Sequence, residues 1–386
     1  MTESAPSSEE QRESEIFNHK QHTAELLGVS PDDVSFQYMG DKFERRGFYN
    51  YFFSEGQKEA FVKTGRTPEA NTHLRREAAS AQIAKDLNIP IKQAVPLKGS
   101  TEFDNYSEKD EVGVLGQELL SGDEWTFLVT PEMIEHADND LARDYGSALA
   151  EIAMTKLGNE IPTQTSIEPL RHDQNADWRY RSPELCNKVW QESSERVIAN
   201  LDVVYPSNLE EEQAKIAALA AEGIARMDFL VANSPAEEGK HYFVHGDFDA
   251  NNICLKPDGT EYRVLDFEHA GASQYQPLAR LTDVSNCFGR CRPNPVMQES
   301  FIRESMRVHK EKSHEDAYHL LRSAIIFGTL YLAKFGMDPN HGEHPRVAQQ
   351  LKQLDHNLKS LDDEYMKISS DTNSSTAQPA EVLPEN

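Results

Sequence analysis

Three polar residues near position 250 combine the side chains that phosphoryl transfer requires. Asp247 is followed five residues later by Asn252, and Asp266 comes after one short stretch of chain. A carboxylate beside a hydroxyl nucleophile can act as its base, and two oxygen ligands can hold Mg²⁺ on nucleotide phosphates. Asp247 is therefore the candidate catalytic base, and Asn252 and Asp266 are the candidate metal ligands.

The residues between Asn252 and Asp266 predict a β-hairpin. Residues 253–255 and 262–265 are short strand-like runs, and the turn-forming residues 257–259 lie between them. Strand pairing would bring the two oxygen ligands close together. A polar loop capped by Asp and Asn would explain each residue singly, but it would not explain their joint spacing.

The complete pattern resembles the catalytic and metal-binding loops of the aminoglycoside phosphotransferase / choline kinase-like family. It runs H-G-D-x4-N from His245 to Asn252, continues through the hairpin, and ends with D-F-E from Asp266 to Glu268. Members of this family are small-molecule kinases. The resemblance implies an α+β, two-lobed protein-kinase-like fold, with a small β-rich N-lobe and a larger, mainly helical C-lobe. It also implies transfer of the γ-phosphate of ATP, with Mg²⁺, to a hydroxyl of a small molecule.

The order of predicted elements agrees with such a fold. Strand-like runs at 34–38, 48–53 and 60–63 precede a helix over 71–86 and another strand over 113–120. Helical patterns dominate the rest of the chain. The predicted helices cover 141–157, 183–201, 208–231, 320–335 and 347–366.

These patterns divide the chain into four parts. We expect a disordered acidic tail over 1–20, an N-lobe that binds nucleotide over 30–118, and a C-lobe with the catalytic loop and acceptor site over 122–366. Residues 367–386 have the polar composition of a second disordered tail.

Phosphoryl transfer also needs a cation on the nucleotide phosphates, and Lys63 is the best candidate. It ends a strand and lies 14 residues before Glu77, which falls on the predicted helix. The family resemblance implies an ion pair between Lys63 and Glu77, for which Glu69 is a nearby competitor. A strand-edge lysine and an exposed helical glutamate are the ordinary alternative.

Two further nucleotide-binding segments rest on the resemblance. The family's inter-lobe hinge corresponds to residues 117–122, where backbone groups near Glu118 and Leu120 would meet the adenine ring. The loop that covers the phosphates would be residues 40–47, which begin and end with glycine but lack the G-x-G-x-x-G pattern.

Other residues around the motif have less definite roles. By the resemblance, His245 orients the catalytic loop, and Asp283 is a structural aspartate of the C-lobe. Asp249 could face the substrate or simply form a turn. Glu268 could assist metal binding. These alternatives stay open at the level of sequence.

Composition limits the partners of the protein. The 386 residues carry a formal net charge of −26, which argues against nucleic acid and mildly favours a cationic acceptor. No run of residues is long and apolar enough for a membrane span, and the N-terminus lacks the features of a secretory signal. The four cysteines are too few for a disulfide framework, so we expect reduced thiols and a cytoplasmic protein. The oligomeric state is not indicated.

Two other functions compete with a kinase. One is a non-catalytic nucleotide-binding regulator on the same fold, because a fold does not guarantee an activity. The other is a metallophosphoesterase, since residues 246–249 contain Gly-Asp followed by a second Asp. That chemistry also needs D-x-H and G-N-H-[D/E] motifs to build two metal sites, and neither is present.

Overall fold

The computed structural model describes most of the chain, in two compact units. The described residues are 8–31, 35–38, 47–55, 58–65, 67–98, 105–109, 111–122, 124–127, 139–170, 182–290, 294–308, 314–337 and 344–375. The first unit contains Met1–Phe127, Pro162–Asp173 and Asn252–Gly271, and the second contains Leu128–Ile161, Gln174–Asn251 and Ala272–Asn386.

An antiparallel sheet of five strands forms the centre of the first unit, in the order β1-β2-β3-β5-β4. Lys63 lies on β3 and is paired with Asn50 of β2 and Leu115 of β5. The strands are β1 (Ser35–Tyr38), β2 (Phe48–Glu55), β3 (Lys58–Gly65), β4 (Tyr106–Lys109) and β5 (Val112–Glu118).

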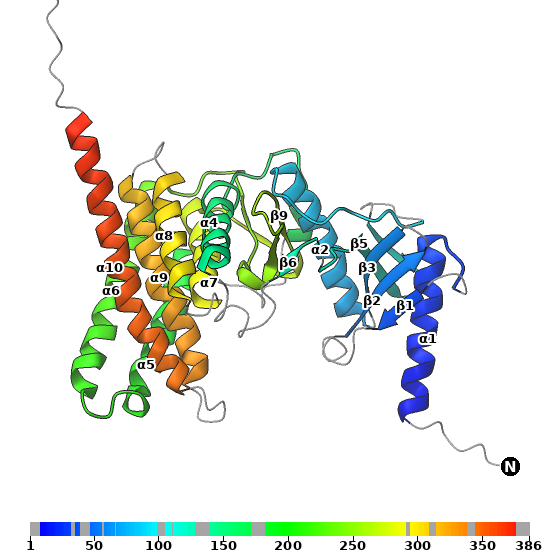
Figure 1. The fold of residues 1–386 in the computed structure, drawn as a ribbon, viewed down its shortest axis with the longest axis horizontal. Helices are drawn as coiled ribbons and strands as arrows, with labels where there is room; N and C mark the ends of the chain where they lie inside the picture. Colours follow the sequence, from blue (N-terminus) through cyan, green and yellow to red (C-terminus); the bar gives the residue numbers. More distant parts are fainter. Residues whose placement is uncertain are drawn as a thin grey trace, which may run out of the picture. The chain divides into compact units, whose positions relative to one another are not determined.

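Two helices cover the two faces of this sheet, α1 (Ser8–Leu27) and α2 (Pro68–Asp86) (Figure 1). Alternate residues of a strand point to opposite faces, so neighbouring residues serve different helices. Val62 and Val114 pack with Leu26 of α1. On the other face, Leu115 packs with Leu74 of α2. Lys63 follows Val62 and therefore points to the α2 face.

The start of α2 follows from its sequence. Thr67 is the N-cap, and its hydroxyl accepts a hydrogen bond from the N–H of Ala70 at 3.1 Å. Pro68 occupies the first turn, where its missing N–H costs nothing. The buried Asn71 accepts a hydrogen bond from the N–H of Gly113 at 2.9 Å, which ties the helix to β5. The cap and this bond together fix where Glu77 lies along the sheet.

The predicted hairpin is present. Strands β8 (Ile253–Leu255) and β9 (Tyr262–Val264) pair antiparallel, and β6 (Thr126–Phe127) joins them on the other side of β8. The N–H of Val264 donates to the carbonyl of Pro90 at 2.8 Å, which attaches the hairpin to the segment after α2. The chain also forms the short 3-10 helices η2 (Glu168–Leu170), η4 (Ala250–Asn252) and η5 (Phe267–His269).

The second unit is mainly helical (Figure 1). The helices are α4 (Asn139–Thr155), α5 (Pro183–Ala199), η3 (Leu201–Val203), α6 (Leu209–Asn233), α7 (Gln276–Arg290), α8 (Pro295–Val308), α9 (His314–Gly336) and α10 (His344–Ser375). Helix α9 is apolar over most of its length and packs against α5, α6, α7 and α10, so it forms the centre of the bundle. The small sheet here pairs β7 (Tyr242–Val244) with β10 (Gly271–Ser273).

The prediction of disordered tails was wrong for part of each tail. Residues 8–20 belong to α1, because the aliphatic residues at its end pack on the sheet. Residues 367–375 continue α10. The hairpin over 253–264, placed in the C-lobe from sequence, clusters with the first unit through its bond to Pro90. The predicted phosphate loop falls on residues 40–47, of which only Gly47 lies within the described part.

Candidate active site

Three charged side chains of the first unit meet on the α2 face of the sheet. The ammonium of Lys63 lies 2.9 Å from Oε2 of Glu77 and 3.2 Å from Oδ1 of Asp266. Glu77 is 1% exposed, whereas Asp266 is 34% exposed. The ion pair implied by the family resemblance is therefore present with Glu77, and the competitor Glu69 is exposed.

Electrostatics keep Lys63 charged in this position. Burial by itself lowers the pKa of a lysine, but the negative charges of Asp266 and Glu77 outweigh it and raise the pKa of Lys63 above its usual value. The buried Gln117 of β5 adds a donor to Glu77 Oε1 at 3.5 Å. The cluster thus holds a permanent cation next to a carboxylate that is open to solvent.

The two candidate metal ligands lie at one end of the hairpin. The N–H of Leu265 donates to the carbonyl of Asn252 at 2.8 Å, so Asp266 directly follows a residue bonded to Asn252. Asp266 has φ of +58°, in the left-handed region that few residues other than glycine, asparagine and aspartate adopt. Such backbone strain is common where a side chain must point in a particular direction for function.

The loop that carries Asp247 is held by α7 of the same unit. The buried carboxylate of Asp283 accepts the N–H of His245 at 2.9 Å and the N–H of Gly246 at 2.8 Å. Asn286, one turn further on α7, donates to the carbonyl of Gly246 at 2.6 Å. Gly246 has φ of +82°, which permits the sharp turn before Asp247. These bonds give Asp283 a structural role in holding the loop, as the family resemblance implies.

The structure narrows the roles of the neighbouring residues. Asp249 is 3% exposed, and its Oδ1 accepts the N–H of Asn251 at 2.7 Å, which is the geometry of a turn-forming aspartate. Glu268 is buried, and its Oε1 lies 3.3 Å from His269. His245 is fully buried, with its ring edge-on to Phe248. Of the two roles that the sequence left open for Asp249, the structure shows the formation of a turn.

The two hinge candidates differ in how their groups are used. The N–H of Glu118 donates to the carbonyl of Gln93 at 2.9 Å, and its side chain lies 3.6 Å from Arg263. Leu120 is buried against Trp125 and Cys254. The N–H of Glu118 is thus already engaged with protein, and adenine recognition by this segment stays a prediction.

Sequence reasoning missed two residues of interest. Asn286 follows Asp283 by three positions, so both lie on one face of α7, but nothing local marked them as partners of the loop. Lys92 belongs to no motif, so the sequence alone does not single it out. Its ammonium lies 4.5 Å from the centre of the Phe61 ring, two positions before Lys63 on β3.

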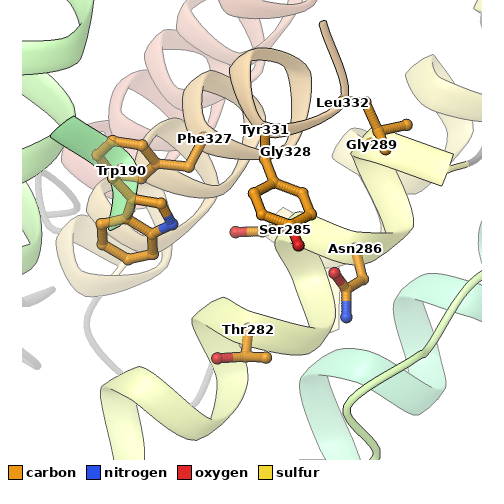
Figure 2. Close-up of a pocket in the computed structure, with 9 residues that line it drawn as sticks. All are labelled: Trp190, Thr282, Ser285, Asn286, Gly289, Phe327, Gly328, Tyr331 and Leu332. Atoms are coloured by element: carbon orange, nitrogen blue, oxygen red, sulfur yellow. The ribbon is translucent and has the colours of Figure 1, made fainter. Parts of the chain in front are cut away.

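A small pocket lies beside Asn286, between α5, α7 and α9 of the second unit (Figure 2). It has a volume of about 10 Å³, enough for one water. In Figure 2, Ser285 and Asn286 of α7 lie near the ring of Tyr331. Trp190 stacks on Phe327, with ring centres 3.8 Å apart. The pocket therefore brings aromatic faces and hydroxyl groups to Asn286, which bonds the backbone just before Asp247.

The fold and the charged cluster define a class. A five-stranded antiparallel sheet with a lysine–glutamate pair between sheet and helix, together with a mainly helical second unit, is the architecture of kinase-like phosphotransferases. The sequence profile of the phosphotransferase enzyme family matches residues 44–274, more than half of the chain. The chain belongs to this family, and it is a small-molecule kinase. The predicted fold class is confirmed.

Three solved structures are similar to the chain. An aminoglycoside phosphotransferase of Alicyclobacillus acidocaldarius subsp. acidocaldarius DSM 446 has a TM-score of 0.56 at 13% identity, over 87% of this chain and 93% of its own. A Plasmodium vivax ethanolamine kinase has a TM-score of 0.46 at 13% identity, over 91% of both chains. A spectinomycin phosphotransferase in complex with ADP and spectinomycin has a TM-score of 0.47 at 12% identity, over 87% of this chain and 93% of its own.

The first of these similarities supports the fold assignment. No curated protein sequence matches the chain. Across the described ranges, no helix combines the length and apolar character that crossing a bilayer demands. Cys186, Cys254 and Cys287 are buried, and Cys291 lies outside the described residues.

Proposed function

We propose that this protein transfers the γ-phosphate of ATP to a hydroxyl of a small cationic molecule. The observation that carries the proposal is the cluster in which Lys63 bridges Glu77 and Asp266. A fixed ammonium can bind nucleotide phosphates, and Glu77 holds it in position. Asp266 keeps a third of its surface exposed, which leaves its carboxylate able to bind a further partner.

Asp266 and Asn252 would hold Mg²⁺. Both supply oxygen ligands, the type that Mg²⁺ prefers, and the bond from Leu265 to Asn252 aligns them at the end of the hairpin. No cluster of three or more His, Cys, Asp or Glu suited to a metal occurs among the described residues. A pair of ligands fits Mg²⁺, which commonly takes its remaining ligands from water and substrate phosphates. When bound, the ion neutralises charge on the phosphates.

Asp247 would orient the acceptor hydroxyl and accept its proton as the oxygen attacks phosphorus. Its loop is fixed by the bonds of Asp283 and Asn286 to the backbone before it. A carboxylate on such a fixed loop loses little freedom during the reaction, which lowers the entropic part of the barrier. The products would be ADP and a phosphorylated small molecule.

Two features support a cationic acceptor. The chain has a net charge of −26, which attracts cations until salt screens it. In the second unit, the ammonium of Lys334 lies 4.0 Å from the ring centre of Tyr331 and 5.0 Å from that of Phe335. Tyr331 also lines the Asn286 pocket, so an aromatic face at this pocket accepts an ammonium group, and we propose that an amino-alcohol or aminosugar replaces that of Lys334.

An acceptor screen tests the proposal. Amino-alcohols, aminoglycosides, neutral sugars and a generic protein are incubated with radiolabelled ATP, with and without Mg²⁺, and the Asp247→Asn variant measures background. We expect Mg²⁺-dependent labelling of cationic acceptors, with apparent affinity that weakens as ionic strength rises. Labelling of neutral sugars alone would refute the cationic preference. Nucleotide binding without transfer to any acceptor would instead indicate a non-catalytic regulator.

A further inference from the structure

Arg280 is a buried cation that lacks the partners of comparable arginines. It is 6% exposed on α7, and its one polar contact with the described residues is from Nη2 to Oδ1 of Asn159, at 3.4 Å. Its Nε is buried and has no hydrogen-bond partner in the described part of the chain. Burial lowers the pKa of Arg280, and no neighbouring carboxylate among those described opposes this. Burying an unpaired charge is costly, so such a group normally has a counter-ion.

Another arginine of the same bundle shows the usual arrangement. Arg322 on α9 is 14% exposed, and its guanidinium contacts Glu222 Oε1 at 2.5 Å and Asp362 Oδ1 at 2.7 Å. The second unit therefore supplies carboxylates to a partly buried arginine elsewhere. Arg280 is more buried than Arg322 but lacks this compensation within the described residues.

The side chain of Arg280 is held in place by its surroundings. A Cβ atom at Gly158 would lie 2.2 Å from Cγ of Arg280, so the arginine stem passes directly over this glycine. Gly158 has φ of +64°, and its N–H donates to the carbonyl of Phe243 at 3.0 Å. Asn159 completes the support at the other end of the side chain. A fixed guanidinium can bind a ligand without a large loss of conformational entropy.

Arg280 lines a cavity of about 90 Å³ that is formed within the second unit. A single water needs a cavity volume of roughly 10–15 Å³, so this cavity has room for a small polyatomic ion. The exposed residues Asn233 and Ser234, at the end of α6, give it polar groups and access to solvent. Asp316 also lines the cavity, but it is exposed, so solvent screens its charge.

We propose that this cavity binds a small oxyanion, a carboxylate or a phosphate, on the guanidinium of Arg280. Two oxygens on one atom match the parallel N–H groups of arginine, which makes this ligand class more favourable than a monatomic anion. The ligand would supply the counter-charge that the described protein groups do not.

Thermal unfolding of the full chain with inorganic phosphate, acetate or chloride at matched ionic strength tests this site. We expect phosphate or acetate to raise the melting temperature above that in chloride, and Arg280→Gln to weaken the apparent affinity at least tenfold. A rise with phosphate alone, or with acetate alone, identifies which oxyanion is preferred. Equal effects of all three anions, or no effect of any, would overturn the proposal and leave a water-filled cavity.

Two controls separate this site from other anion sites. Arg322→Gln makes the same substitution at an arginine that already has carboxylate partners, and it should leave the anion effect intact. The double variant Lys63→Met/Glu77→Gln removes the cation proposed for nucleotide phosphates, and the anion effect should survive there too. Its loss in that variant, with persistence in Arg280→Gln, would assign the effect to the nucleotide site and refute ours.

If Arg280→Gln does not fold, the variant Ser234→Leu tests anion binding in the cavity instead. This variant retains the arginine and places an apolar side chain at an exposed position of the cavity lining. We expect it to unfold cooperatively and to lose the anion effect. An undiminished effect of phosphate or acetate in Ser234→Leu would contradict binding in the cavity.

Discussion

The ammonium of Lys63 and the Oδ1 of Asp266 lie 3.2 Å apart, although 203 positions separate the two residues in the chain. Glu77, the other partner of Lys63, is almost completely buried, whereas Asp266 is partly exposed. One lysine therefore connects a structural carboxylate to a carboxylate that can bind a ligand. This difference in exposure leads to separate expectations for stability and activity.

Replacing Lys63 by methionine should destabilise the protein as well as inactivate it. The substitution leaves Glu77 buried without its cation, which typically costs about 3–5 kcal/mol. Adding Glu77→Gln should restore the melting temperature but not phosphotransfer. Thermal unfolding and a labelled-ATP assay on both variants check this. A double variant that regains activity would show that Lys63 is needed only for folding.

Asp247→Asn should lower turnover on the order of 10²–10⁴-fold with folding intact, because the amide keeps the shape but cannot accept the proton. Asp249→Asn is the matched control two residues away. An asparagine there can still accept the N–H of Asn251, so the turn should survive and turnover should change little. Rates from steady-state kinetics on both variants decide. Equal losses at the two positions would contradict the assignment of the base.

Asp266→Asn should remove the dependence of nucleotide binding on Mg²⁺. Asparagine tolerates the φ of +58° at this position, so the variant tests the charge and not the backbone, whereas alanine would confound the two. Calorimetric titration of ATP with and without Mg²⁺ gives the measurement. Glu268→Gln serves as the comparison, and a larger loss there would transfer the metal-binding role to Glu268.

Asp283→Asn should reduce both stability and turnover. The carboxylate of Asp283 now accepts hydrogen bonds from the backbone N–H groups of His245 and Gly246. In the variant, the amide NH₂ would face one of these two donors, which would lose its acceptor. An unsatisfied buried group costs about 1–3 kcal/mol. Urea denaturation and steady-state kinetics measure the two effects, with Asp228→Asn on the exposed side of α6 as control. Normal turnover in a destabilised Asp283 variant would limit this residue to a folding role.

The lowered pKa of Lys92 should make the free energy of unfolding depend on pH. Burial lowers the pKa of Lys92 from the ordinary 10.5 to about 8. Between these values the unfolded chain binds more protons than the folded one, so this residue makes stability rise with pH across that window. Lys92→Met should flatten the rise, while exposed Lys85→Met should not. Urea midpoints from about pH 7 to about pH 10 report the difference. Parallel curves for wild type and Lys92→Met would contradict a lowered pKa.

The sequence by itself determined the residues of the motif and the hairpin that carries it. Turn residues 257–259 between two strand-like runs leave few structures other than a hairpin, and strand pairing then places Asn252 near Asp266. The helix predicted over 71–86 is also present, although α2 begins three residues earlier, where Thr67 caps it and Pro68 occupies its first turn. These features depend on contacts between residues that are close in the chain, so local patterns suffice to predict them.

Only the tertiary structure decided which distant groups meet. The packing of separate elements selects Glu77 and not Glu69 as the partner of Lys63. It also brings Asp283 and Asn286 into hydrogen-bond contact with the catalytic loop, and it buries Arg280 without a carboxylate among the described residues. The polar composition of the segment that forms α1 predicts disorder, because a helix of this kind gains its stability from packing on the sheet and not from its own sequence. Composition and spacing contain no record of such contacts, since the energy of each depends on the three-dimensional arrangement of both partners.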